Sequence, residues 1–531
     1  MKKITILASL FFALSFNAQT KRPDNWFNLD ATKDSVYGVS TEKTYQELLK
    51  GKKSKTIIVG VLDSGVDYMH EDLKDVMWTN SKEIAGNGID DDKNGYIDDI
   101  HGWNFMGNKD GKNVDKDNLE LTRVYKSLKA KYDGKEITTL TSKSDKKEFK
   151  YWQKVKADYE KELTEQENQV KQYKFIRESI AEIVEKIKKE KGVEKVTLED
   201  LKAFEAKDKK EKQAKSIAVN QGIKGVNVDD LLKDIDHHLE SIDGSMLNVN
   251  FDTRSIVGDN YNDLNEKIYG NADCKGPGAF HGTHVAGIIA ASRKNGIGID
   301  GVADNVRIMS VRCVPDGDER DKDVANAIRY AVDNGAVILN MSFGKKYSPG
   351  KKAVDEAVKY AESKGVLLVH AAGNASDDID EVIHYPCKKL ESGKTPTNFI
   401  DVGALNWKLG DQIAAPFSNY GKNTVDIFAP GVDIHSTVPD INKYKDASGT
   451  SMAAPVVAGV AAVLKSYYPE LTPKQIIKIL TKTSVKTFKD KKVIKPGTED
   501  EMIEFNELSK TGGIVNLYEA IKLAEKMFPS K

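Results

Sequence analysis

Residues 449–462 read GTSMAAPVVAGVAA, which places Thr450 and Ser451 at the start of a run of small and apolar residues. Serine and threonine are favoured at helix N-termini, and such a run predicts a helix that passes through a packed core. The unpaired N–H groups at the start of this helix would face Ser451 and any group that Ser451 attacks. Ser451 is therefore either an ordinary helix cap or a nucleophile beside donors for an oxyanion, and residues elsewhere in the chain decide between the two.

Two polar residues upstream lie beside predicted elements of the same kind. Residues 56–62, TIIVGVL, form an apolar, β-branched run of strand length that ends at Asp63. Open α/β sheets gather functional residues at the carboxyl ends of such strands, although an aspartate before Gly65 is also a common turn residue. His281 begins HGTHVAGIIA and stands directly before a predicted apolar helix, where a packed or capping role for His281 or His284 is the alternative.

The region after residue 253 alternates between strand and helix patterns. We expect strands at 307–311, 337–341, 366–371, 399–404 and 425–429, and helices at 284–292, 323–334, 352–364, 449–462, 473–481 and 512–527. Such alternation predicts an α/β fold with a mainly parallel sheet and helices on both faces. The helix at 512–527 is expected to close the core.

Residues 111–252 have a different composition, rich in Lys and Glu and nearly free of Gly and Pro over long stretches. Apolar residues at steps of three, four and seven predict one long helix over about 149–187, and a second stripe predicts another over 228–242. Thr197 and Asp200 match a capping box. Because the stripes are narrow, these helices should pack on each other as an inserted all-α hairpin or bundle.

Composition limits the classes of partner. The 531 residues contain 80 Lys and Arg against 81 Asp and Glu, so the net charge of −1 gives no general reason to expect nucleic acid or an anionic membrane as a partner. Three cysteines, Cys274, Cys313 and Cys387, allow at most one internal disulfide and show no zinc spacing.

Residues 1–18 have the pattern of an export signal. Lys2 and Lys3 precede the apolar run 4–16, and Ala18 is a candidate cleavage position, although Phe16 departs from the small residue usual two places before the cut. We therefore expect a secreted or extracytoplasmic protein. Beyond the signal, we expect no stretch apolar for long enough to span a membrane.

A dense run of carboxylates and turn formers, NGIDDDKNGYIDD, occupies residues 87–99. Its oxygen donors alternate as in a calcium loop of the EF-hand type, with Gly95 at the sharp turn. His101 stands where the closing glutamate would be, so a further ligand must come from elsewhere; a solvated acidic turn is the alternative. The expected ligands of a structural Ca²⁺ are Asp90, Asp92, Asn94, Tyr96 and Asp98.

Asp63, His281 and Ser451 together contain the parts of an activated serine nucleophile. A serine hydroxyl is a poor nucleophile at neutral pH, but a histidine can take its proton and return it to a leaving group. A buried aspartate holds the histidine tautomer and stabilises the imidazolium. The combination predicts acyl transfer.

Four separated motifs are similar to those of a known family, the subtilisin-like serine proteases or subtilases. They are VLDSGVD at 61–67, HGTHVAG at 281–287, AAGN at 371–374 and GTSMAAP at 449–455. The resemblance covers about 56–108 and 253–486, and weakly the C-terminal helix. It implies a subtilisin-like fold and a serine endopeptidase acting on proteins or peptides.

The resemblance also implies roles for individual residues. Asp63, His281 and Ser451 would be catalytic, and the Asn374 side chain would form the oxyanion hole with the Ser451 N–H. An edge segment would pair with the substrate backbone and, with a second segment, line the first specificity pocket. Those substrate-binding residues are Ser342, Phe343, Gly344, Ala371, Ala372 and Gly373.

The chain departs from the family pattern in two ways. His281 lies 218 residues after Asp63, so we interpret 111–252 as an insertion between two parts of the catalytic domain, 19–110 and 253–531. Few residues separate the signal from Asp63, and a family-type propeptide does not fit there. A propeptide of this family assists folding and then inhibits the enzyme. We hypothesise that the inserted helices take over part of this function, restrict access to the cleft or bind a protein partner. The alternative functions are a dedicated maturation protease with a docked partner and a catalytically silent binding or scaffold protein.

Overall fold

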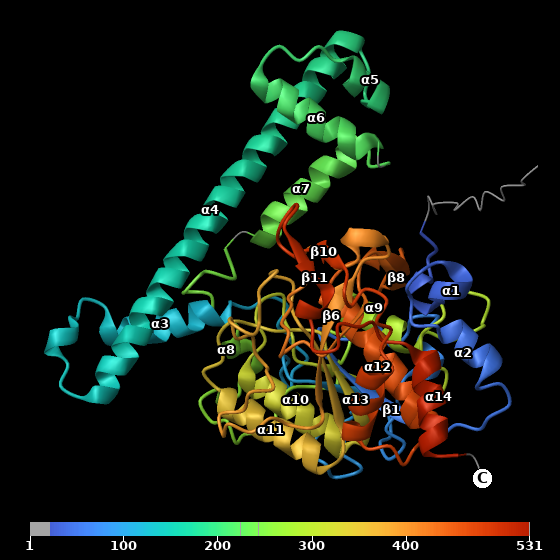
Figure 1. The fold of residues 1–531 in the computed structure, drawn as a ribbon. Coiled ribbons are helices and arrows are strands. Elements are labelled where there is room, and N and C mark those ends of the chain that lie inside the picture. Colours follow the sequence, from blue (N-terminus) through green and yellow to red (C-terminus); the bar gives the residue numbers. More distant parts are fainter. Residues whose placement is uncertain (1–21, 224, 243, 530–531) are drawn as a thin grey trace, which may run out of the picture.

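The computed structural model describes residues 22–223, 225–242 and 244–529, so the export signal expected over 1–18 lies outside the described residues. A seven-stranded sheet forms the centre of the molecule (Figure 1). Its order is β2-β3-β1-β4-β5-β6-β7, and every neighbouring pair is parallel. The α/β prediction is confirmed. The strands are β1 (Ile57–Asp63), β2 (Gly102–Asn104), β3 (Val306–Arg312), β4 (Ala336–Met341), β5 (Leu367–Ala371), β6 (Phe399–Leu405) and β7 (Ile427–Pro430).

Helices cover both faces of this sheet, which explains why its strands read as nearly continuous apolar runs. On one face, Val59 and Val61 of β1 pack with α9 (Phe280–Ala290), α12 (Thr450–Tyr467), α13 (Pro473–Lys482) and α14 (Leu517–Met527). On the other face, Leu62 packs with α10 (Asp321–Asp333) and α11 (Lys351–Ser363). Asp63 thus ends a central strand that is buried on both sides.

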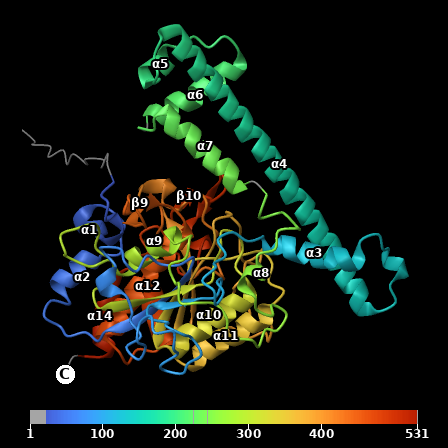
Figure 2. The ribbon, with the colours of Figure 1, turned by 180° about the vertical axis from the view of Figure 1, so that it is seen from behind.

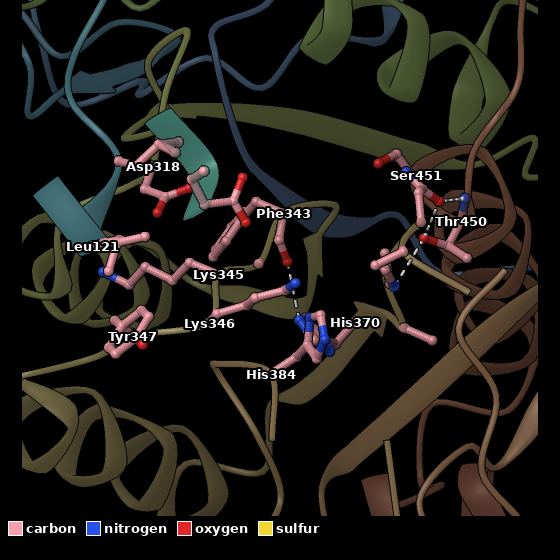
Figure 3. A pocket seen from close by; sticks show the side chains of 18 residues that line it. Leu121, Asp318, Phe343, Lys345, Lys346, Tyr347, His370, His384, Thr450 and Ser451 are labelled. Atoms are coloured by element: carbon pink, nitrogen blue, oxygen red, sulfur yellow. Dashed lines mark hydrogen bonds between the residues drawn. The ribbon is translucent and has the colours of Figure 1, made fainter. Parts of the chain in front are cut away.

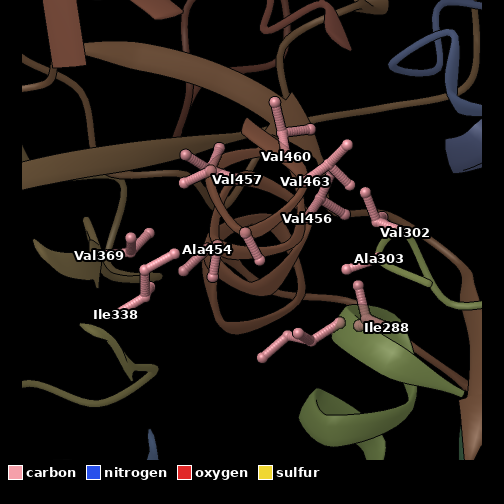
Figure 4. Packing of buried hydrophobic residues seen from close by; sticks show 14 of the residues in the cluster. Ile288, Val302, Ala303, Ile338, Val369, Ala454, Val456, Val457, Val460 and Val463 are labelled. Carbon is pink, nitrogen blue, oxygen red and sulfur yellow. The ribbon is translucent and has the colours of Figure 1, made fainter. Parts of the chain in front are cut away.

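Helix α12 runs through the larger of the two cores, where Val456, Val457 and Val460 pack among side chains of the sheet and of α9 (Figure 4). Among the described residues it is the one helix long and apolar enough to cross a membrane, contrary to our expectation that no such stretch follows the signal. Since 83% of its 18 residues are buried inside the molecule, the packing of α12 in the core explains why this helix is so apolar.

Several predicted helix boundaries differ from the structure, and two of the helix starts bear on the site and the core. Helix α9 begins at Phe280, so His281 lies in its first turn instead of before it. Helix α14 begins at Leu517 instead of 512, because the Asn516 side chain accepts from the Glu519 N–H and caps it. The preceding Ile514 is extended and bridges to Phe428.

Smaller elements complete the catalytic part of the chain. None of them was predicted individually, because each is short. They are α1 (Ala31–Asp34), α2 (Thr41–Glu47), α8 (Arg254–Val257), the hairpin of β8 (Ile434–Thr437) and β9 (Tyr444–Ala447), and the hairpin of β10 (Lys492–Ile494) and β11 (Met502–Glu504).

The charged block between the catalytic motifs forms a helical arm that projects from the catalytic part (Figures 1 and 2). The long and the final helix are confirmed, and the capping box of Thr197 and Asp200 is present. Two further helices, α3 and α6, were missed. The arm comprises α3 (Glu120–Tyr132), α4 (Lys143–Lys191), α5 (Leu198–Ala203), α6 (Lys209–Ile223) and α7 (Val228–Ile242).

The arm has two separate hydrophobic clusters. The proximal lobe packs α3 against the first part of α4, with Leu247 and Tyr347, so it shares a residue with the catalytic part. The distal lobe packs the last part of α4 against α5, α6 and α7. The predicted packing of the inserted helices on each other is therefore confirmed. Lys345 attaches the proximal lobe further, through a buried 2.8 Å ion pair with Glu120 of α3.

Candidate active site

Asp63 and His281 are joined directly. Asp63 ends β1, His281 lies in the first turn of α9, and the His281 Nδ1 is 2.7 Å from the Asp63 Oδ1. Asp63 is 1% exposed, whereas 38% of the His281 side chain is exposed. Gly282 permits this approach, since a Cβ there would lie 2.2 Å from the Gly65 carbonyl oxygen. The neighbouring His284 is the packed histidine, with its Nε2 3.0 Å from the Ile434 carbonyl oxygen.

The carboxylate sets the basicity of this imidazole. Burial lowers the pKa of His281, but the charge and hydrogen bond of Asp63 raise it by more, so the pKa lies above its ordinary value. Since Nδ1 faces the carboxylate, the neutral ring carries its proton there and leaves Nε2 as a proton acceptor. The pair has the arrangement of a general base and its orienting acid.

Ser451 lies in the first turn of α12, but neither it nor Thr450 caps the helix as expected. The N-cap is Gly449, which has no side chain for that purpose. Instead, the Asn374 Oδ1 accepts from the Thr450 N–H at 2.8 Å and from the Thr450 hydroxyl at 2.9 Å. A side chain from another segment thus caps α12 beside Ser451.

The Ser451 hydroxyl is held by the neighbouring segment. It donates to the Ser342 carbonyl oxygen at 3.2 Å, and the Ser342 hydroxyl donates to the Ser451 carbonyl oxygen at 2.9 Å. Within the described part of the chain, no hydrogen bond joins Ser451 to His281. Catalytic hydrogen bonds are often long or misaligned without a bound substrate, so this geometry still allows Ser451 to turn to the base.

A cavity of about 420 Å³ opens beside Ser451 (Figure 3). Of the predicted substrate-binding residues, Phe343, Gly344, Ala371, Ala372 and Gly373 line it with Asn374; Ser342 lines a second cavity together with Asp63 and His281. The structure therefore brings the predicted residues to one cleft. The lining residues that were missed from sequence include His370 and His384 and, from the arm and its start, Leu119, Leu121 and Glu162.

The two histidines belong to separate contacts, of which only that of His370 is buried. His370 lies between the Asp401 Oδ1 at 2.7 Å and the Phe343 carbonyl oxygen at 3.0 Å, which fixes the edge segment to β5. The His384 Nε2 is 2.8 Å from the Asp377 Oδ2. Burial lowers the pKa of His384 and outweighs the opposing effect of Asp377, so this ring is neutral at neutral pH.

The predicted calcium loop brings only some of its expected ligands together. The carboxylates of Asp90 and Asp92 converge with Glu83, with ligand atoms of all three within 4.8 Å of one another. Glu83 was missed from the sequence, and its position makes it a candidate for the further ligand that was expected from elsewhere. Its oxygens also accept from the N–H groups of Asp92 and Asp98. Three carboxylates are a donor set that suits Ca²⁺.

The other expected ligands lie differently. The Asp98 carboxylate instead accepts hydrogen bonds from the N–H groups of residues 86, 87 and 88 and is not among the clustered groups. The Asn94 oxygen accepts from the Tyr96 N–H, and the Tyr96 ring is buried. Asp98 is therefore not part of the cluster that the structure forms. All three cysteines are free thiols, so the disulfide that the sequence allowed is not formed.

The chain is similar in sequence to known serine proteases. A family model described as the subtilase family matches residues 54–501. The chain is 45% identical over 188 residues to "Thermophilic serine proteinase" of Bacillus sp. (strain AK1), which covers 35% of this chain and 42% of that protein. It is 37% identical over 217 residues to "Thermitase" of Thermoactinomyces vulgaris, covering 40% and 72%. A solved structure of a protease from Pseudoalteromonas arctica matches at 30% identity over 46% of this chain and 70% of that chain, with a TM-score of 0.37.

Proposed function

This chain belongs to the subtilase family of serine proteases, and on that premise we propose that it is a secreted serine endopeptidase that hydrolyses peptide bonds in proteins. The observation that carries the proposal is the 2.7 Å contact of Asp63 with His281 in the cleft that holds Ser451. Because the match spans only 42% of one of these relatives, the activity of the whole protein is part of the proposal. Secretion is supported by the signal pattern of residues 1–18.

Acylation begins with Ser451. Its hydroxyl leaves the Ser342 carbonyl, Oγ attacks the carbonyl carbon of the scissile bond, and the His281 Nε2 takes the proton. Asp63 holds the ring tautomer and stabilises the imidazolium that forms. The tetrahedral intermediate then collapses, the C–N bond breaks, and His281 gives its proton to the leaving amine. Water attacks the acyl-enzyme by the same steps and releases the second product.

Asn374 is oriented to stabilise the oxyanion. Its Oδ1 is occupied by two hydrogen bonds from Thr450, so the amide is fixed with Nδ2 as the donor available to the cleft. The Thr450 hydroxyl is itself fixed, because it accepts from the Gly373 N–H at 3.0 Å. Nδ2 and the Ser451 N–H together are the donors for the negative oxygen.

The substrate backbone pairs with the edge segment Ser342, Phe343 and Gly344, and its side chain before the scissile bond enters the cavity of Figure 3. Because this pairing uses the substrate main chain, substrates of many different sequences can bind. The base of the arm restricts this cleft, since Leu121 of α3 and Glu162 of α4 line the same cavity. The distal lobe is the candidate surface for a protein partner.

A structural Ca²⁺ is part of the proposal. Glu83, Asp90 and Asp92 would hold it, and the ion would neutralise three carboxylates on one loop. Asp98 supports the loop by binding the 86–88 backbone. The ion supplies no step of the reaction.

Incubation with a mixture of unfolded proteins tests the proposed function. A general endopeptidase cleaves many of them, and Ser451→Ala cleaves none. A dedicated maturation protease would cleave one target only, and a silent scaffold protein would cleave nothing and would not react with a serine-directed phosphonate. Either of these results would contradict the proposal.

A further inference from the structure

A second cavity, of about 410 Å³, adjoins the cavity of Figure 3. The two share Phe343 and Gly344, but the second is lined by His281 and by residues of the loop after β3, among them Val314, Asp316 and Glu319, whereas Ala371 lines only the first. Neighbouring side chains of an extended peptide point to opposite sides. A substrate that pairs with the edge segment therefore has one side chain directed to each cavity.

The second cavity is acidic. Asp115, Asp316 and Glu319 line it, in addition to the Asp63 that binds His281. Asp115 and Asp316 are held side by side, because the Asp316 N–H donates to the Asp115 carbonyl oxygen at 2.9 Å. Both are exposed at the opening, and Glu319 is 2% exposed. The carboxylates come from both the start of the arm and the loop after β3.

The one cation in this lining does not neutralise the cavity. Arg312 is fully buried, and its guanidinium donates to the Ser64 carbonyl oxygen at 2.9 Å, the Asn104 Oδ1 at 3.1 Å and the Val114 carbonyl oxygen at 2.5 Å. Its donors are thus directed to neutral oxygens. Asp115 and Asp316 are therefore left as the carboxylates that attract a cationic ligand at the opening.

Glu319 differs from Asp115 and Asp316 because it is buried, and one of its carboxyl oxygens lacks a hydrogen-bond partner. Its Oε1 is buried and receives no hydrogen bond from any described residue. The nearby Lys345 ammonium donates to the Glu319 carbonyl oxygen and is paired with Glu120 at 2.8 Å and Asp321 at 2.9 Å. Burial raises the pKa of Glu319 to about 8, Asp318 and Asp321 act in the same direction, and Lys345 opposes them. A buried carboxyl without a donor is costly unless a ligand supplies one.

The described carboxylates of this cavity do not form a metal cluster. The Glu83 cluster is the one group of three or more potential ligands found within 4.8 Å of one another in the part of the chain that the structure describes. Apolar walls are also present, from Val314, Pro315 and Phe280, whose residue surface is 41% exposed. A long side chain with an aliphatic stem and a cationic end fits such walls better than a bare ion.

We propose that this cavity binds a lysine or arginine of the substrate, at the residue directly before the one held in the cavity of Figure 3, with Glu319 as the specificity-determining carboxylate. This inference rests on the proposed endopeptidase function. The cationic end donates to the unpaired Glu319 carboxylate, Asp115 and Asp316 attract it at the opening, and the stem packs on Phe280 and Val314.

Matched peptides test the inference. They differ only at the residue before the one in the first pocket, which is lysine or its uncharged analogue norleucine. We expect the wild type to cleave the lysine peptide with a kcat/KM about tenfold higher, the effect of one partly buried charge-assisted hydrogen bond. Glu319→Gln, which keeps the shape, should reduce the ratio to about two or three. Asp110→Asn removes an exposed carboxylate elsewhere and should leave the ratio unchanged.

Asp115→Asn combined with Asp316→Asn is a second variant, at exposed positions where folding is not at risk. It should lower the lysine preference by a smaller factor. Equal rates for both peptides with the wild type, or an unchanged preference in Glu319→Gln, would overturn the inference while leaving a working protease. Absence of any serine-dependent cleavage, with no phosphonate label, would overturn the proposed function and the inference with it.

Discussion

The side-chain oxygen of Asn374 accepts hydrogen bonds from both the backbone N–H and the hydroxyl of Thr450, at 2.8 and 2.9 Å. This contact caps α12 and at the same time fixes which end of the Asn374 amide faces the cleft. The segment after β5 and the start of α12 are therefore coupled through one amide. Disturbing either residue should affect turnover before it affects folding.

Asn374→Ala should lower kcat about a hundred- to a thousandfold with a smaller change in KM, because it removes an oxyanion donor. Thr450→Val should lower kcat by roughly tenfold through the misplaced amide. Thr450→Ser keeps the hydroxyl and is the matched control. Steady-state kinetics on one peptide measure all three; equal rates for the two Thr450 variants would contradict the orienting role.

The acid limb of the pH profile should report His281. Only the neutral ring accepts a proton, and its pKa lies above the ordinary value, so kcat/KM should fall as the pH drops through a midpoint above about 6.5. Asp63→Asn removes the charge that raises this pKa while burial still lowers it, so the midpoint should move below 6.5 and kcat should fall by roughly 10⁴. An unchanged midpoint in Asp63→Asn would contradict the coupling.

The same shift has a consequence for stability. The pKa of His281 is higher in the folded protein than in the unfolded chain. The contribution of His281 to the free energy of unfolding is therefore fully present below its pKa in the unfolded chain, and it is lost as the pH rises through its pKa in the folded protein. Differential scanning calorimetry should show that the Tm advantage of the wild type over His281→Gln is larger at acid pH and becomes smaller as the pH is raised.

Calcium should stabilise the fold through Glu83. Addition of Ca²⁺ at about a hundred times its Kd should add about 2.7 kcal/mol to the free energy of unfolding, and a chelator should remove it. Glu83→Gln should abolish the response of Tm to Ca²⁺. Asp98→Asn should lower Tm because it weakens the 86–88 turn, yet the response to Ca²⁺ should remain. A wild-type Tm that is the same with chelator and with Ca²⁺ would contradict the site.

The distal lobe can be removed at the point where α4 and α7 are in contact. The Gln166 side chain reaches the Ile242 carbonyl oxygen at 2.5 Å, so a short Gly-Ser linker can replace residues 167–241. The truncated protein should keep its Tm for the catalytic part and its kcat/KM on a short peptide within about twofold, because the proximal lobe and Lys345–Glu120 remain. Cleavage of large folded proteins or refolding yield should change.

If both remain unchanged, the distal lobe neither restricts access nor assists folding. Deleting the whole block from 116 to 246 is a less specific test. It removes Glu120 and leaves the buried Lys345 without one of its partners, a change expected to cost several kcal/mol in itself.

The sheet and its active-site edge could be predicted because both depend on local pattern. Asp63 ends an apolar run that only a buried parallel strand explains, and the strands after it alternate regularly with helices. Helix α3 was missed although Leu121, Val124 and Leu128 repeat at helical spacing. Helix α6 offers much less signal, because Ala214 and Ala218 are its main buried apolar residues.

Contacts that depend on tertiary structure could not be read from the sequence. Gly449 can stand at the N-cap position of α12 because the capping side chain, Asn374, comes from the segment after β5. Serine and threonine were therefore wrongly expected to be the local caps. Glu83 precedes the acidic loop at no characteristic spacing, and only the fold turns it toward Asp90 and Asp92. Glu319 is likewise an ordinary loop carboxylate in the sequence, and only the fold buries it in the cavity that His281 also lines.

Reaction with a serine-directed phosphonate, followed by intact-mass and peptide mass spectrometry, tests the role of Ser451 most directly. We predict one adduct per chain, on the peptide that contains Ser451, with parallel loss of proteolysis. Ser451→Ala should take up no phosphonate and show no proteolysis while keeping the wild-type Tm within about 2 °C, since the substitution removes one hydroxyl near the surface of the cleft. An adduct on another residue, or proteolysis retained by a folded Ser451→Ala protein, would contradict the assignment of Ser451 as the nucleophile.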